Sequence, residues 1–167
     1  EDALRGVSIV GGKMFASYLH NASSQVKVFD LKGNYQQDLE LPGIGSVGGV
    51  SGKKSDQQGF FTFSSFTVPG TIYSLDTESM SYEVFRSPEV DFDADAFETR
   101  QVWFTSKDGT RVPMFLTMKK GIKLDGSQPT LLYGYGGFDI PVTPGFNLTR
   151  IPLLENGGIY AVANIRG

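Results

Sequence analysis

The feature that most constrains the fold is a pattern of four short β-type runs that occurs twice before residue 88. The runs cover residues 7–10, 13–19, 25–31 and 35–41 in the first round, and 46–50, 59–66, 71–75 and 82–85 in the second. In each round the third run leads into a turn with an aspartate, Asp30 or Asp76. A repeat of about 40 to 45 residues with four strands is typical of propeller blades. The sequence therefore predicts four-stranded antiparallel blades over residues 1–90.

The repeated pattern of β-type runs ends after the second round. Residues 91–97 are rich in aspartate and show neither a helical nor a strand period, which is typical of a crossing between domains. Blades bury their faces only against neighbouring blades, so we also expect further blades upstream. The expected boundaries are residues 1–90 for the last two blades of a propeller, 91–97 for the crossing and 98–167 for the beginning of a second domain.

The second region predicts a different architecture. Two β-type runs, 98–104 and 110–118, are joined by a turn with the hairpin dipeptide Asp108-Gly109. A short apolar strand at 130–133 precedes a glycine-rich turn and a short helix over 147–156, with Asn147 as the N-cap. The final run, 158–167, predicts a strand buried on both faces. This order is typical of the start of an α/β sheet with an antiparallel edge.

Composition narrows the possible partners. The net charge of −3 and the pI of about 5.1 provide no basic patch for nucleic acid, and the chain has no cysteine for a disulfide or a thiolate metal site. No apolar run approaches the roughly 18 residues that a membrane helix needs. Asp91, Asp93 and Asp95 alternate, but they lack the glycine and glutamate of a calcium loop. We therefore expect no nucleic acid, membrane, metal or cofactor; the compartment, cytoplasmic or periplasmic, stays open.

The segment 131–138, LLYGYGGF, places two tyrosines and three glycines directly after an apolar strand. Glycine loses the most backbone entropy on folding, so such a cluster needs a reason. From the residues alone, core aromatics around a buried turn explain the segment more often than a site does. The alternative is the mouth of an active site.

Four segments together resemble the prolyl oligopeptidase family of serine peptidases: 104–110, 119–126, 132–138 and 161–167. The resemblance implies a mixed fold, with all-β propeller blades followed by the first strands of an α/β-hydrolase sheet. It also implies a Ser-Asp-His triad and hydrolysis of short proline-containing peptides on the carboxyl side of proline, without a metal or cofactor. We expect the parent protein to be a monomer.

The resemblance also implies site residues. The second tyrosine of the motif, Tyr135, matches the residue whose hydroxyl stabilises the oxyanion in this family, and Phe138 matches an aromatic that lines the pocket for the proline ring. Gly134, Gly136 and Gly137 are expected to shape the loop so that its backbone turns sharply and approaches the substrate. Tyr133 is expected in the core.

The triad itself is expected downstream, because no serine here lies in a Gly-x-Ser-x-Gly elbow; Ser46 has Ile44 in place of the first glycine. The single histidine, His20, ends a predicted blade strand and is interpreted as structural. The isolated chain is therefore expected to be inactive. Three alternatives remain: an oligopeptidase that cleaves after basic residues, an acylaminoacyl peptidase of the same family, or a non-catalytic β-propeller binding module.

Overall fold

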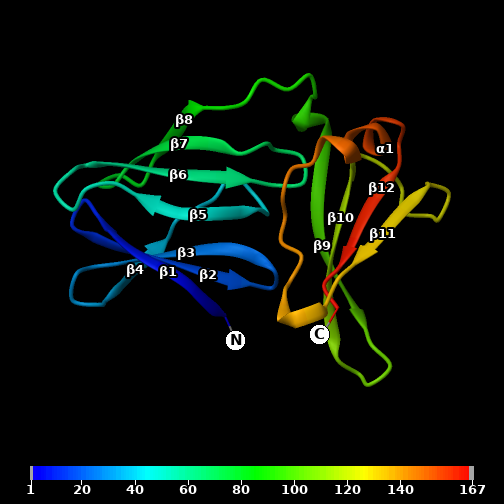
Figure 1. Ribbon diagram of the computed structural model, residues 1–167, viewed down its shortest axis with the longest axis horizontal. Helices are drawn as coiled ribbons and strands as arrows, with labels where there is room; N and C mark the ends of the chain where they lie inside the picture. Colours follow the sequence, from blue (N-terminus) through cyan, green and yellow to red (C-terminus); the bar gives the residue numbers. More distant parts are fainter. Residues whose placement is uncertain (1, 166–167) are drawn as a thin grey trace.

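The computed structural model describes residues 2–165, which form three four-stranded sheets. Two sheets follow each other along the first half of the chain, and the third stands beside them (Figure 1). Most neighbouring strands are antiparallel; the single parallel pair among the described residues is β11 with β12. Within the same residues, no helix is long and apolar enough to cross a membrane.

The first two sheets are simple meanders in which each strand pairs with the next along the chain. Their strands are β1 (Ala3–Val10), β2 (Lys13–His20), β3 (Ser23–Phe29) and β4 (Tyr35–Asp38), then β5 (Ser46–Ser51), β6 (Gln58–Ser64), β7 (Thr71–Asp76) and β8 (Tyr82–Arg86). All eight strands predicted from the β-type runs are confirmed. The inward residues of both sheets, including Phe15, Val28, Phe61 and Leu75, form one shared core. The two sheets therefore pack face to face, as neighbouring blades do.

The third sheet has the order β11-β12-β10-β9. Its elements are η1 (Ala94–Ala96), β9 (Phe97–Thr105), β10 (Arg111–Lys119), β11 (Thr130–Gly134), η2 (Gly137–Asp139), η3 (Leu148–Arg150), α1 (Ile151–Glu155) and β12 (Ile159–Ala163). The predicted hairpin is confirmed, since β9 and β10 pair along their whole length. Asn147 caps the predicted helix, its side-chain oxygen accepting from the Thr149 amide at 2.9 Å. Only Ile151–Glu155 is α-helical, because the first turn is a 3-10 helix and Pro152 follows it.

The two parallel strands of this sheet, β11 and β12, differ in how far they are buried. Every residue of β12 is buried, which confirms the strand predicted there; residues 166 and 167 of that prediction lie outside the described part. β11, by contrast, is exposed along its whole length because it is the edge strand of the sheet. The expectation of a core position for Tyr133 is wrong, since its side chain is 45% exposed. An apolar strand sequence cannot distinguish an edge from a centre.

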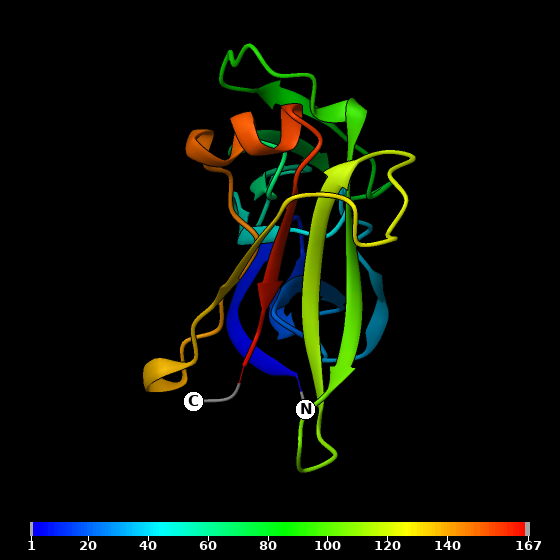
Figure 2. The same cartoon turned by 90° about the vertical axis from the view of Figure 1, so that its right-hand side faces the viewer.

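A second apolar core joins the blades to the third sheet. Phe66, from the β6–β7 turn, lies 5.6 Å from the ring of Phe115 on β10 and 5.7 Å from that of Tyr160 on β12. Ala22, from the β2–β3 turn, belongs to the same cluster, together with Val162. Figure 2 looks onto the third sheet, with the blades behind it. Two turns of the blades therefore fix the third sheet against them.

Charged and polar side chains link the start of β1 to strands β2 and β3. The carboxylate of Asp2 accepts a hydrogen bond from Nδ1 of His20 at 2.5 Å and lies 3.6 Å from Nζ of Lys27. The His20 hydrogen bond is the main cause that lowers the pKa of the Asp2 carboxyl. His20 therefore ties the first strand to the end of β2, which agrees with its interpretation as a structural residue.

Replacement of Phe66 by alanine is expected to destabilise the protein by about 3–5 kcal/mol, because it removes a ring that is 1% exposed from the core shared by the blades and the third sheet. Urea denaturation measures the loss. The control is Leu124→Ala, which truncates an apolar side chain that is already 52% exposed and should cost about 1 kcal/mol or less. Equal midpoints for the Phe66 variant and the unmodified protein would contradict the shared core.

The pKa of Asp2 is expected to lie below the ordinary value of 3.8 and to rise towards it in His20→Leu. A folded-state pKa below the unfolded one means that the link stabilises the fold above the unfolded pKa and is lost as the pH falls through the folded pKa. An NMR titration of the carboxyl carbon measures both midpoints. Identical midpoints in the two proteins would show that His20 does not stabilise the Asp2 carboxylate.

Candidate functional site

The glycine-rich loop begins where β11 ends, beside the buried strand β12. Gly134 pairs with Ala163 across the parallel strands, and a Cβ on Gly134 would lie 3.3 Å from the Ala163 carbonyl oxygen. That distance is tighter than ordinary van der Waals contact, so the close approach of β12 favours glycine here. This contact is a physical reason for glycine at position 134, while the predicted role of Gly134 in shaping the loop for the substrate stays a prediction. The loop leaves the sheet at the carboxyl end of β11, the edge where parallel strands commonly carry functional groups.

Tyr135 is the first residue of the loop, and its side chain is 38% exposed. Its phenol folds back over Gly137: a Cβ built on Gly137 would lie 2.9 Å from Oη and 3.0 Å from Cζ of Tyr135. None of the hydrogen bonds found among residues 2–165 uses the Tyr135 hydroxyl. The structure thus holds a phenol at the surface of the loop with an uncommitted donor.

Phe138 lies at the tip of the same loop. Its φ of 57° and ψ of 30° place it in the left-handed region, and Asp139 follows with a φ of 57°. Two such residues in succession are uncommon outside glycine, and backbone strain of this kind gathers at functional sites. The ring is 90% exposed, so the described residues leave it almost uncovered. The predicted pocket role of Phe138 stays a prediction.

The loop faces the first strand of the blades across an open cavity of about 520 Å³. Arg5 contributes a cation from β1, and Asp139 contributes an anion from the loop. Gly136, the second of the three predicted loop glycines, lines the same cavity. The remaining lining residues are Ala3, Leu19, Ile140, Pro141, Asn164 and Ile165. The cavity is therefore built jointly by blade strands β1 and β2, the glycine-rich loop and the residues after β12.

Sequence reasoning found only Gly136 among the residues of this cavity and missed Asp139, Arg5 and Asn164. The register between β1 and β2 shifts between Leu4 and Gly6, so Arg5 is the extra residue of a β-bulge, a feature that often re-aims a side chain next to a site. Asn164 accepts from the Val142 amide at 3.0 Å through Oδ1, while its buried Nδ2 has no partner within the described chain. The sequence carries no signal for the bulge; Asn164 lies inside the run 158–167 that was predicted as a buried strand, where a polar residue was the available hint.

The far end of the loop is anchored to the second blade. The hydroxyl of Ser46 on β5 donates to the Pro144 carbonyl at 2.6 Å, and the amide of Phe146 donates to the Ser64 hydroxyl on β6 at 3.3 Å. Arg150 donates to the Gly145 carbonyl at 3.1 Å, and its guanidinium carbon lies 4.5 Å from the Tyr160 ring centroid. Burial raises the pKa of the Tyr160 phenol, so the ring beside Arg150 stays neutral. The segment between Tyr135 and Ile140 therefore lies between the end of β11 and these supports.

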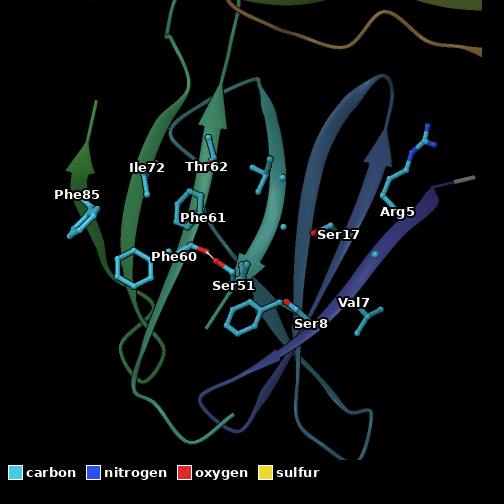
Figure 3. Close-up of a pocket in the computed structure, with 16 residues that line it drawn as sticks. Arg5, Val7, Ser8, Ser17, Ser51, Phe60, Phe61, Thr62, Ile72 and Phe85 are labelled. Atoms are coloured by element: carbon cyan, nitrogen blue, oxygen red, sulfur yellow. Dashed lines mark hydrogen bonds between the residues drawn. The ribbon is translucent and has the colours of Figure 1, made fainter. Parts of the chain in front are cut away.

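A larger cavity, of about 650 Å³, lies among the blade strands (Figure 3). Phe60 on β6 and Phe85 on β8 meet edge to face there, with ring centroids 5.1 Å apart. In Figure 3 the side chain of Arg5 extends away from these rings. The lining contains none of the predicted loop residues and no acidic residue or histidine. The smaller cavity is therefore the candidate site, because Gly136 of the predicted loop lines it together with the charged residues Arg5 and Asp139. Tyr135 and Phe138, from the same loop, are not among its lining residues.

The geometry around His20 does not form a triad. Its Nδ1 pairs with Asp2, and its Nε2 lies 2.9 Å from Nδ2 of Asn21, so an amide stands where a nucleophilic hydroxyl would be needed. The described residues thus contain a hydrogen-bond donor of the kind that an acyl-transfer site uses, the Tyr135 hydroxyl. They contain no Ser-His pair that would serve as nucleophile and base.

Comparisons with known proteins identify a family that this chain resembles over most of its length. A family model described as the prolyl oligopeptidase N-terminal beta-propeller domain matches residues 1–88. The prolyl endopeptidase of Elizabethkingia miricola is 43% identical over 157 residues, which cover 94% of this chain and 22% of that protein.

Solved structures extend the likeness to the third sheet. A prolyl endopeptidase structure superposes with a TM-score of 0.85 at 40% identity, over 99% of this chain and 24% of its own. Prolyl oligopeptidase B of Galerina marginata gives a TM-score of 0.86 at 32% identity, again over 99% of this chain and 24% of its own. The chain spans less than a quarter of the length of these relatives.

Proposed function

Because the chain belongs to the prolyl oligopeptidase family, we propose that it forms part of a serine endopeptidase that hydrolyses short peptides on the carboxyl side of proline. The observation that carries the proposal is the exposed Tyr135 phenol, in a loop whose next residue, Gly136, lines the cavity between the blades and the third sheet. Relatives named prolyl endopeptidase that align with 94% of the chain support this assignment.

The proposed domain organisation follows from the sheets. Residues 1–90 form the last two blades of a propeller, 91–97 cross between domains, and 98–167 begin a catalytic domain of α/β-hydrolase type. The mixed sheet supports this division, since β11, α1 and β12 form a parallel unit with a helical connection beside an antiparallel hairpin. The cavity beside the loop would then lie between the two domains.

The chemistry assigned to this part of the enzyme is charge stabilisation. A serine outside these residues attacks the peptide carbonyl, a histidine takes its proton, and the carbonyl oxygen gains negative charge in the tetrahedral intermediate. The Tyr135 hydroxyl donates a hydrogen bond to that oxygen. Because its donor is not committed to another described group, no existing hydrogen bond must break first. Without the nucleophile and base, the chain alone is inactive.

Phe138 is assigned to the substrate rather than to the protein interior. Its ring stands 90% exposed at the loop tip, where it offers an aromatic face to a proline ring. The left-handed backbone of Phe138 and Asp139 holds the ring away from the sheet. An apolar face at this point favours proline over a basic side chain, which separates the proposal from an oligopeptidase that cleaves after basic residues.

Replacement of Tyr135 by phenylalanine is expected to lower kcat on a proline-containing peptide by about 10²-fold, as expected for the loss of one oxyanion donor. The measurement is steady-state hydrolysis by the complete enzyme. Tyr133→Phe is the matched control, since this neighbouring phenol lies on the exposed edge strand β11 and should keep kcat within about twofold. An unchanged rate in the Tyr135 variant would remove Tyr135 from catalysis.

Replacement of Phe138 by alanine is expected to lower kcat/KM about 10-fold for a peptide with proline before the cleaved bond, because one aromatic contact is lost. Phe138→Tyr keeps the ring face and should retain most of the activity. A second peptide, with alanine in place of proline, should lose less. Equal losses on both peptides would mean that Phe138 shapes the loop and does not contact the proline ring.

A further inference from the structure

We propose that Gly137 is a positioning residue that sets the location of the Tyr135 hydroxyl by having no side chain. This inference rests on the proposed function of Tyr135. A Cβ on Gly137 would lie 2.9 Å from Oη, 3.0 Å from Cζ and 3.4 Å from Cε2 of Tyr135. The two shortest distances involve the hydroxyl end of the ring. The phenol therefore occupies the space that any other residue at position 137 would fill.

The backbone of Gly137 does not itself require glycine. The left-handed glycines of the chain, such as Gly109 and Gly157, have φ values of 83° and 80°, but Gly137 is not among them. At Gly134 the close neighbour is a backbone carbonyl, whereas at Gly137 all three nearest atoms belong to the Tyr135 side chain. The phenol is therefore the specific neighbour that excludes a side chain at Gly137.

The loop around Gly137 is held so that it cannot easily move aside. The Ile140 amide donates to the Gly137 carbonyl at 3.2 Å and closes the 3-10 turn, while Phe138 and Asp139 reverse the chain in the left-handed region. On the other side, β11 fixes Gly134 against β12. A methyl group at position 137 would therefore displace the phenol rather than the backbone.

Such a displacement matters because the described residues do not hold the hydroxyl by a hydrogen bond. Its position depends on the contact between the ring and Gly137 and on the backbone at Tyr135. Oxyanion donors act over about 2.7–3.1 Å, and a misplacement of about 1 Å can cost about 10²-fold in rate. Gly137 thus leaves the donor free for the substrate and still limits where the ring can lie.

The test uses the complete enzyme with Gly137→Ala, Tyr135→Phe and the double variant. We expect Gly137→Ala to lower kcat by about 10- to 100-fold with KM within about twofold, and to add less than about twofold in the Tyr135→Phe background, since no hydroxyl is left to misplace. Gly145→Ala is the matched control. It lies in the same connection, has no left-handed φ and has no atom within 4 Å of a built Cβ, so it should keep the full rate.

The outcomes separate this inference from the proposed function. If Tyr135→Phe is slow but Gly137→Ala is as fast as the unmodified enzyme, the positioning role is overturned and the oxyanion role stands. If Gly137→Ala costs the same factor with and without the hydroxyl, Gly137 acts through the backbone and the inference is also overturned. If Tyr135→Phe keeps the full rate, the oxyanion role itself fails.

A second measurement, made on the enzyme with Gly137 intact, covers the case in which Gly137→Ala does not fold. With selectively labelled glycine, the ring current of Tyr135 should move the Gly137 α-protons away from their ordinary chemical shift in the NMR spectrum of the enzyme. The shift should disappear in Tyr135→Leu. Gly137 α-protons that are unchanged by this replacement would contradict the contact and overturn the proposal.

Discussion

The packing of Phe66 between Phe115 and Tyr160 is the contact on which the geometry of the candidate site depends. Phe66 comes from a turn of the second blade, and its two ring partners come from the two central strands of the third sheet. Because interiors are closely packed, a buried ring fixes both elements with little freedom. This core sets the distance between β1 of the first blade and the loop that follows β11, and hence the size of the cavity between them.

From that core, burial decreases towards the loop tip. β12 is wholly buried, and the connection after the loop is tied to the second blade through Ser46 and Ser64. Between these supports, Tyr135 and Phe138 stand at the surface. The arrangement agrees with what acyl transfer requires: a rigid scaffold that presents a donor which no protein group has already used. The glycines let the backbone lie close to β12 and beneath the phenol.

Much of the fold could be predicted from residue types, because local physics decides it. Short β-type runs predicted all eight blade strands, Asp108-Gly109 predicted the hairpin, and Asn147 was predicted as the N-cap of the short helix. The errors and omissions have a common cause, since they depend on neighbours distant in sequence. Tyr133 is exposed because β11 forms an edge, and Arg5 reaches the cavity through a bulge. The site residues came from family resemblance; their local composition alone favoured a buried turn.

The central claim is that Tyr135 donates to the oxyanion of a cleaved prolyl bond. A structure of the complete enzyme with a peptide aldehyde ending in proline tests it directly, because the serine adduct carries an oxygen where the oxyanion forms. The account predicts the Tyr135 hydroxyl at about 2.7–3.1 Å from that oxygen, with the ring still over Gly137. A hydroxyl more than about 4 Å away, with another donor on the oxygen, would contradict it.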